Sequence, residues 1–180
     1  MKLFISPHND DETLFGAFTL MREHPLVVIV TDAWKQFNRG ENITADQRWN
    51  ETVEAMKILE CPVIRLGIRD DIIDEWAIHD KLSRFIGFDT TYIPALQGGN
   101  PHHDMISNVL LFTCKLSPNI VQYTTYSKDN LYTVGETEIV PTEKELQLKE
   151  KALACYQSQI NLPATAPHFE AVKGRSEWYI

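Results

Sequence analysis

The sequence predicts an α/β fold with a mostly parallel sheet. Short β-branched apolar runs alternate with amphipathic segments along the chain, which is the pattern of strand–helix repeats. The apolar runs are continuous, as in strands that helices cover on both faces. We therefore expect a Rossmann-like three-layer sandwich. A length of 180 residues without internal repeats suits a single domain over residues 1–180.

The first half of the chain is expected to hold three strands and two helices. Its elements, in order, are a strand at Leu3–Ile5, a helix at Glu12–Glu23, a strand at Leu26–Thr31, a helix at Asp46–Glu60 and a strand at Pro62–Leu66. In the second helix, Val53, Met56 and Leu59 fall on one face, which predicts packing of that face against the sheet.

The second half continues the alternation. Its expected elements are a helix at Ala77–Phe85, a strand at Thr90–Ala95, a helix at Asp104–Leu116, a strand at Asn119–Thr125 and a long helix at Thr142–Gln159. The last helix begins with Thr-Glu-Lys-Glu, which is typical of a capping box and marks its N-terminus.

The composition excludes several classes of function. A net charge of −8 argues against a nucleic-acid surface, which needs clustered Lys and Arg. Because no run of about 18 apolar residues is present, no membrane span is expected, and Leu3–Ile5 is too short an apolar run for a signal peptide. Cys61, Cys114 and Cys155 are widely spaced and are interpreted as free thiols. We expect a soluble cytoplasmic protein. Its oligomeric state stays open, and a homo-oligomer is one of the alternatives.

A first polar cluster, Pro7–Glu12, follows the first predicted strand. It places His8 directly before an asparagine and three carboxylates. Adjacent carboxylates repel one another unless a cation is close, and His and Asp are suitable zinc ligands. The alternative is that these acids only cap the following helix, since carboxylates stabilise a helix N-terminus.

A second polar cluster, Gly98–Asp104, follows the fourth predicted strand. Because ligands bind beyond the carboxyl ends of parallel strands, the two clusters are expected to meet at one edge of the sheet. The side chains of adjacent histidines diverge, so one of His102 and His103 is expected to bind a metal and the other to line or orient the pocket. The alternative for this cluster alone is a solvated loop capped by Asp104. Together, the clusters contain the two imidazoles and one carboxylate of a hydrolytic zinc site. The dinucleotide fingerprint Gly-x-Gly-x-x-Gly is absent after the first strand, which argues against a nicotinamide or flavin.

Together these segments resemble the LmbE/PIG-L family, which removes acetyl groups from N-acetylglucosamine-type substrates. The family's first motif reads roughly (A/P)-H-P-D-D-E, and Pro7–Glu12 matches it except at Asn9. Its second motif often reads G-G-H-P-D-H-D, and Gly98–Asp104 matches the glycines, the proline, the last histidine and the final aspartate. Weaker matches follow the family's order at Thr31–Asp32, Arg48–Glu51, Leu66–Asp70 and Tyr156–Gln159.

The resemblance implies a role for each matching residue. His8, Asp11 and His103 would be the metal ligands, with Zn²⁺ as the cofactor, although this donor set accepts other divalent ions. Asp10 would be the general base that takes a proton from water at the metal. The substrate side of the pocket would be lined by Asp32, Arg48 and Asp70. Outside the family pattern, Trp34 follows Asp32 closely, and its ring can stack on a sugar or another planar ligand, with a core or rim residue as the alternative. Arg48 has the alternative of a helix ion pair with Glu51, and Asp70 that of shaping a turn.

Two departures from the family pattern lie in the second cluster. Asn100 stands where the family has a histidine that helps to stabilise the tetrahedral oxyanion. An amide donates a hydrogen bond but provides no proton or charge, and losing one oxyanion donor typically costs about 10²–10³ in rate. His102 replaces the family's aspartate and is expected to take over the imidazole function. Asn100 and His102 are therefore catalytic candidates beside Asp10.

The predicted function is that of a zinc-dependent hydrolase acting on a linear amide C–N bond. Its expected partner is a small molecule, an acetamido sugar or a conjugate of one, from which it removes the acetyl group. Two alternatives stay open: a metal-dependent amidase or esterase on another acyl substrate, and a catalytically impaired family member that only binds a ligand. The intact His8, Asp10, Asp11 and His103 count against the impaired member, because clustered carboxylates are unfavourable without a cation.

Overall fold

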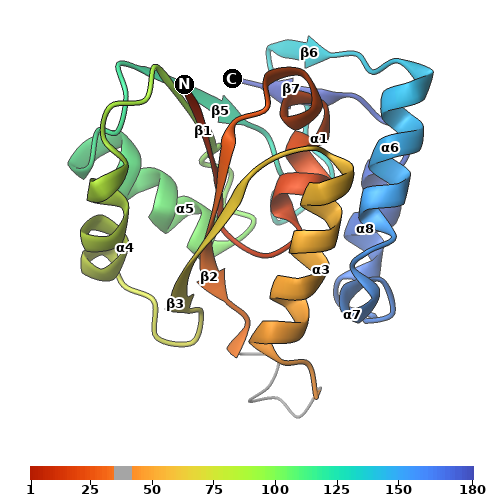
Figure 1. Ribbon diagram of the computed structural model, residues 1–180, viewed down its shortest axis with the longest axis horizontal. Helices are drawn as coiled ribbons and strands as arrows, with labels where there is room; N and C mark the ends of the chain where they lie inside the picture. Colours follow the sequence, from red (N-terminus) through yellow and green to blue (C-terminus); the bar gives the residue numbers. More distant parts are fainter. Residues whose placement is uncertain (35–41) are drawn as a thin grey trace.

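The computed structural model shows a mixed sheet between two layers of helices (Figure 1). It describes residues 1–34 and 42–180. The strands are β1 (Lys2–Ser6), β2 (Leu26–Asp32), β3 (Val63–Arg69), β4 (Thr90–Pro94), β5 (Asn119–Tyr123), β6 (Thr137–Ile139) and β7 (Glu177–Tyr179). Their order in the sheet is β3-β2-β1-β4-β5-β7-β6. Strands β1 to β5 are parallel, and β7 is antiparallel to both β5 and β6. The predicted α/β fold with a mostly parallel sheet is confirmed.

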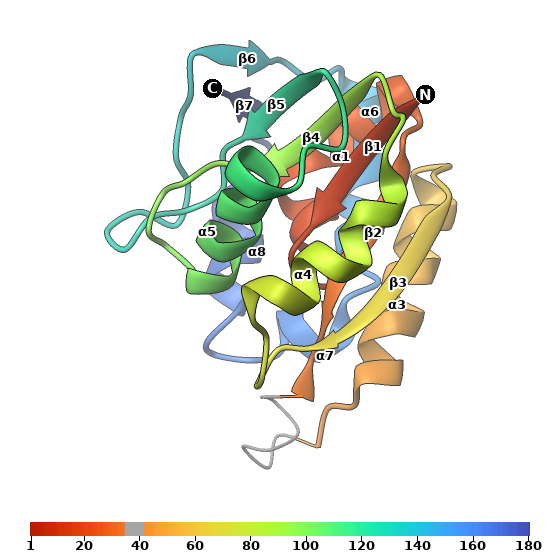
Figure 2. The same ribbon diagram turned by 90° about the vertical axis from the view of Figure 1, so that its left-hand side faces the viewer.

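Helices cover both faces of the sheet. One face carries α4 (Glu75–Leu82), the 3₁₀ turn η1 (Ser83–Phe85), α5 (Pro101–Asn108) and the π-helical turn η2 (Val109–Thr113). The other face carries α1 (Asp11–Glu23), α3 (Ala45–Ile58), α6 (Glu143–Leu153), the short α7 (Gln157–Ile160) and α8 (Ala166–Val172). Figure 2 views the molecule from the side on which α4 and α5 lie in front of the strands. Within the described residues, no helix is long and apolar enough to cross a membrane.

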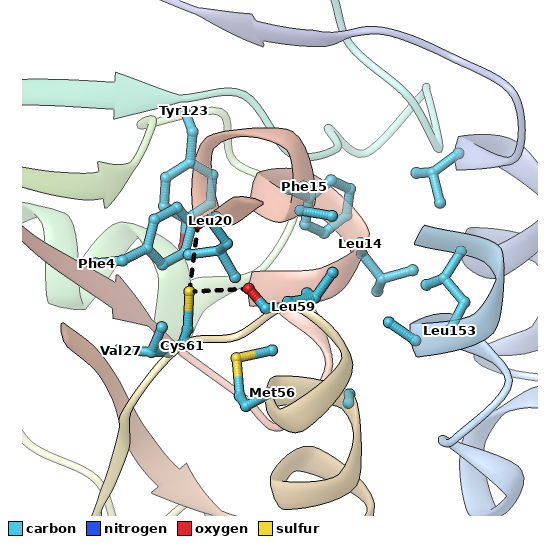
Figure 3. Close-up of a cluster of buried hydrophobic side chains, with 14 of the residues drawn as sticks. Phe4, Leu14, Phe15, Leu20, Val27, Met56, Leu59, Cys61, Tyr123 and Leu153 are labelled. Carbon is cyan, nitrogen blue, oxygen red and sulfur yellow. Dashed lines mark hydrogen bonds between the residues drawn. The ribbon is translucent and has the colours of Figure 1, made fainter. Parts of the chain in front are cut away.

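The core on the α1 side brings the first strand and first helix very close together. The ring of Phe4 stacks on Tyr123 with 4.7 Å between centroids. In the same cluster, the thiol of Cys61 donates to the carbonyl of Leu20 (Figure 3). A Cβ atom at Gly16 would lie 2.3 Å from the Phe4 ring. Only glycine therefore allows α1 to pack this tightly on β1.

The C-terminal third differs from the sequence prediction. The expected long helix Thr142–Gln159 is wrong, because α6 ends at Leu153 and the chain turns before α7. The turn buries Tyr156, whose hydroxyl donates to Glu12, the last residue of the first polar cluster. This tertiary contact overrides the local helical pattern. The short elements β6, β7 and α8 were not predicted.

The strand order creates a crevice beside β1. The chain runs from β1 to β2 and β3 on one side, and then returns to β4 and β5 on the other. Such a reversal separates the loops that follow β1 and β4 and leaves a ligand-binding crevice beyond their carboxyl ends. The two predicted polar clusters occupy these two loops.

Candidate metal centre

The three predicted metal ligands meet in this crevice. His8 Nδ1 lies 2.9 Å from Asp11 Oδ2, His103 Nε2 lies 3.0 Å from the same oxygen, and the two ring nitrogens are 3.2 Å apart. In a tetrahedral site with bonds of about 2.0–2.1 Å, neighbouring ligand atoms lie roughly 3.3 Å apart. The three atoms therefore form nearly one face of such a tetrahedron. Both the spacing and the chemistry of this His–Asp–His donor set fit a divalent metal ion.

The loop after β1 holds its ligands in a strained turn. The carbonyl of Pro7 accepts hydrogen bonds from the backbone and hydroxyl of Thr31 on β2. Asp10 then adopts φ 137°, ψ −31°, a region that a residue with a Cβ atom rarely occupies. Helix α1 begins at the next residue, Asp11. The strain at Asp10 thus places two consecutive carboxylates at the start of one helix.

Glu12 stabilises this turn through hydrogen bonds to its carboxylate. It is fully buried, and its carboxylate accepts hydrogen bonds from the Ser6 hydroxyl at 2.9 Å, the Asp10 backbone N–H at 3.2 Å and the Tyr156 hydroxyl. Three donors satisfy this carboxylate, as a buried charge requires. The third carboxylate of the first cluster therefore shapes the loop, and the two before it face the crevice.

Each ligand histidine is held through its other ring nitrogen. His8 Nε2 lies 2.9 Å from His102 Nδ1, and His103 Nδ1 lies 3.4 Å from the hydroxyl of Thr125. Outer hydrogen bonds of this kind fix the tautomer and orientation of a metal-binding imidazole. His102 therefore contacts the ligand His8 and is not among the residues that line the pocket. The sequence placed it among the catalytic candidates.

The electrostatics of the cluster suit a bound cation. Burial alone would raise the pKa of Asp11, but His103 and His8 together hold it well below its usual range. Burial lowers the pKa of His8, which favours the neutral imidazole that a metal needs. Burial raises the pKa of Asp10 well above its usual value, although Arg48 opposes the shift. The site thus combines an ionised carboxylate, a neutral imidazole and a second carboxyl group that protonates readily.

A pocket of about 230 Å³ opens beside the three ligands. Two of the ligands, His8 and Asp11, line the pocket. The other lining residues are Asp10, Leu14, Arg48, Asn100, Tyr126, Gln159, Ala164, Thr165, His168 and Phe169. The pocket has room for a small acyl group and part of a larger ligand. Its walls combine polar groups near the ligands with apolar side chains such as Leu14.

Asn100 lies in the pocket wall with its amide engaged on both sides. Its Oδ1 accepts the backbone N–H of His102 at 2.9 Å and so caps α5, while its Nδ2 donates to the Tyr126 hydroxyl at 3.0 Å. The preceding Gly99 packs against the Tyr126 backbone so closely that a Cβ atom would lie 2.1 Å from the carbonyl oxygen. Gly99 thus lets the second cluster approach Tyr126.

The four predicted substrate residues divide into two groups. Arg48 lines the pocket and donates to Asp10 Oδ2 at 2.8 Å and to the Asn9 carbonyl. The other three lie outside the pocket lining: Asp32 pairs with Arg65 at 2.7 and 2.9 Å, Asp70 accepts the Trp34 backbone N–H at 2.7 Å, and the Trp34 ring lies 4.4 Å from the Arg69 guanidinium. The arrangement therefore joins only Arg48 to the metal cluster.

Two polar pocket residues, Tyr126 and His168, were not predicted from the sequence. Tyr126 follows β5, and its ring lies 5.4 Å from that of His103. His168 comes from α8, far along the chain from the second cluster, and its ring centroid lies 4.4 Å from that of Tyr126. Neither residue belongs to a local cluster of ligand-type side chains, so no short-range signal marked them.

Similar solved structures share this fold over nearly the whole chain. A triple mutant of a deacetylase of the teicoplanin biosynthetic pathway superposes with a TM-score of 0.75 at 17% identity, covering 99% of this chain and 96% of that one. The conserved protein TT1542 from Thermus thermophilus gives 0.69 at 19% identity, covering 99% and 93%. No protein-family model matches the sequence, and no curated protein sequence is significantly similar to it.

A 4-carboxy-2-hydroxymuconate hydratase from Pseudomonas putida KT2440 has the same fold. It gives a TM-score of 0.62 at 14% identity, covering 99% of this chain and 95% of that one. Further structures of teicoplanin deacetylases include a zinc-inhibited form and a complex with teicoplanin. At these identities the likeness establishes the fold alone, and it agrees with the fold that the sequence resemblance implied. The hydratase shows that this fold also carries a different reaction.

Proposed function

We propose that this chain is a divalent-metal-dependent hydrolase that removes the acetyl group from an acetamido sugar or a sugar conjugate. The observation that carries the proposal is the triangle of His8 Nδ1, Asp11 Oδ2 and His103 Nε2, with sides of 2.9 to 3.2 Å, beside the buried carboxyl group of Asp10. Zinc is the metal that this donor set suits best. The free thiols of Cys61, Cys114 and Cys155 support a cytoplasmic location.

The chain's own residues provide the rest of the chemistry. A divalent ion bound here polarises a carbonyl oxygen and activates water. Asp10 accepts the proton of the attacking water and returns it to the departing nitrogen, acting as base and then as acid. Arg48 holds Asp10 Oδ2 at 2.8 Å and so keeps this carboxylate oriented. Leu14 and Phe169 give the pocket an apolar part that suits the acetyl methyl group.

The charges of the pocket favour an uncharged amide over an anionic substrate. Within the described part of the chain, Arg48 is the only lysine or arginine that lines the pocket, and it contacts Asp10. A divalent ion bound here would offset the charges of Asp10 and Asp11, but no other lysine or arginine of the described lining is left to pair with the several carboxylates of a substrate such as carboxymuconate. The neutral acetamide group needs no such pairing. This contrast favours amide hydrolysis over the reaction of the hydratase.

Acetate release tests the proposal. Zinc-loaded protein is incubated with N-acetylglucosamine derivatives, an acetyl ester and carboxymuconate-type acids. We expect acetate from the acetamido sugars, and the Asp10→Asn variant should keep its zinc and lose about 10²–10⁴ in rate. Asp80→Asn, at an exposed position in α4, serves as the matched control. Preference for the ester or the acid, or an unaffected Asp10→Asn variant, would overturn the proposal.

A further inference from the structure

His168 is an imidazole of the pocket that the preceding chemistry leaves without a role. Of the six histidines in the sequence, two are metal-ligand candidates and His102 holds one of these ligands. His24 and His79 do not line the pocket. His168 lines it from α8, on a part of the chain distant in sequence from both polar clusters. Its ring is therefore available for a further role in the pocket.

The donors that line the pocket are largely engaged with other protein groups. Arg48 donates to Asp10, Asn100 donates to Tyr126, Gln159 donates to the Ser158 hydroxyl, and Thr165 donates to the Gln159 carbonyl. Hydrolysis of an amide creates negative charge on the carbonyl oxygen, and a hydrogen-bond donor beside that oxygen stabilises the transition state. Among the described lining residues, the Tyr126 hydroxyl is held by Asn100 Nδ2, which leaves the ring of His168 as the donor best placed to serve a ligand.

The environment of His168 directs one edge of its ring to the pocket. Within the described residues, its Nδ1 atom is buried and has no hydrogen-bond partner. The part of the side chain that remains accessible is therefore the rest of the ring, which carries Nε2. A buried N–H without an acceptor is costly, so the tautomer with its proton on Nε2 is favoured. Burial also lowers the pKa of His168, which keeps the ring neutral.

The ring is held by aromatic packing. Its centroid lies 4.4 Å from that of Tyr126 at an interplanar angle of 49°, and the Tyr126 ring in turn lies 5.4 Å from His103. Aromatic pairs at such distances have a defined mutual orientation. The Tyr126 ring thus packs against both His168 and the ligand His103.

We propose that His168 is a catalytic residue that donates a hydrogen bond from Nε2 to the carbonyl oxygen of the substrate as negative charge develops there. This inference rests on the proposed hydrolase function for its reaction. It assigns Tyr126 the part of a positioning residue, and it assigns Asn100 to the cap of α5.

Kinetics of the zinc-loaded full-length protein test the proposal. His168→Ala should lower kcat by about 10²–10³ while KM changes little and the zinc content stays the same. His168→Gln should recover part of the loss, because its amide can still donate. Tyr126→Phe retains the ring and should lower kcat by less than about tenfold, since it removes no donor that contacts the substrate oxygen. His24→Asn, an exposed position with φ 43° that asparagine tolerates, is the matched control.

Three outcomes would overturn the role of His168: a kcat of His168→Ala within about threefold of wild type, a loss confined to KM, or a larger loss for Tyr126→Phe than for His168→Ala. If His168→Ala does not fold, His168→Gln carries the same test, and a wild-type kcat in that variant contradicts the proposal.

Nuclear magnetic resonance separates this inference from the proposed function. With ¹⁵N-labelled histidine and zinc-loaded protein, titration with acetate, which presents the carbonyl-type oxygens of the product, should shift the Nε2 resonance of His168. Shifts confined to His8 and His103 would contradict the inference. If the wild type hydrolyses no acetamide, the proposed function fails, but this measurement still decides whether His168 contacts a carbonyl-type oxygen in the pocket.

Discussion

Two groups of buried charges in this molecule differ in whether the protein itself neutralises them. Lys149 on α6 and Glu177 on β7 form a closed pair, with 2.9 Å between Nζ and Oε1 and side chains only 3% and 2% exposed. Both oxygens of Glu177 also accept the Phe18 backbone N–H, and Lys149 Nζ lies 4.6 Å from the centroid of the Phe18 ring. Every charge in this pair has its counter-charge inside the protein.

The crevice beyond β1 and β4 lacks this balance. Asp10, Asp11 and Glu12 are all buried, and Arg48 is the cation that pairs with them directly. Three carboxylates and one guanidinium leave an excess of negative charge. The closed pair joins three elements, whereas the unbalanced group leaves room for a divalent cation. Buried charge that the protein does not neutralise itself therefore indicates a functional site.

Breaking the closed pair should have the largest effect on stability. Lys149→Met leaves Glu177 buried without its cation, which typically costs about 3–5 kcal/mol. Urea denaturation should show this loss in the free energy of unfolding, while the zinc content of the folded variant stays at the wild-type level. The double variant Lys149→Met/Glu177→Leu should regain most of the stability. A double variant no more stable than Lys149→Met would show that the loss does not come from the unpaired charge of Glu177.

Removing the hydrogen-bond partner of the ligand His8 should have an intermediate effect, and this effect is on zinc affinity. His102→Ala removes the partner of His8 Nε2, and the loss of such an outer hydrogen bond typically lowers metal affinity or activity about 10–100-fold. Competition with a chromogenic zinc chelator measures the affinity. His102→Gln, which keeps a hydrogen-bonding side chain, should lose less. Unchanged zinc affinity in both variants would mean that His102 does not orient the ligand.

A third, partly exposed pair should have the smallest effect. Arg22 binds both oxygens of Glu145, at 2.6 and 2.9 Å, and this hydrogen bonding is the main reason that the pKa of Glu145 is lowered to about 2. Because the folded-state pKa is depressed, the pair stabilises the fold above the ordinary pKa of 4.5, and this contribution is lost as the pH falls towards about 2.

Glu145→Gln tests this pH dependence. The variant should show a smaller decrease in the free energy of unfolding between about pH 5 and pH 3 than the wild type, by less than about 1 kcal/mol, since Arg22 is exposed to solvent. Urea denaturation at the two pH values measures the difference. Identical pH dependence in both proteins would show that the pair does not contribute.

The sequence could predict the parts of the site that depend on local pattern. Polar clusters directly after two buried strands placed His8, Asp11 and His103 at one edge of the sheet, because the geometry of a parallel sheet requires it. The direction of a side chain within a cluster was not accessible in this way. His102 was expected to line or orient the pocket, and its Nδ1 lies 2.9 Å from Nε2 of the ligand His8. Which of the two roles it takes could not be predicted from the local pattern.

Residues that only tertiary packing brings to the pocket could also not be predicted from the sequence. Tyr126 comes from the segment after β5 and His168 from α8, and nothing in their own neighbourhoods indicates a ligand site. The helix predicted over 142–159 failed for a related reason, since burying Tyr156 against Glu12 is a long-range contact. Local propensity cannot anticipate such contacts.

Calorimetric titration of zinc into the metal-free, full-length protein tests the claim that His8, Asp11 and His103 form a metal centre. We predict one zinc ion per chain in the wild type and in the His24→Asn control. His103→Ala should bind zinc more than about 100-fold more weakly, since removing a ligand exceeds the effect of removing its support. Equal zinc binding by His103→Ala and the wild type, or no zinc binding by the wild type, would contradict the claim.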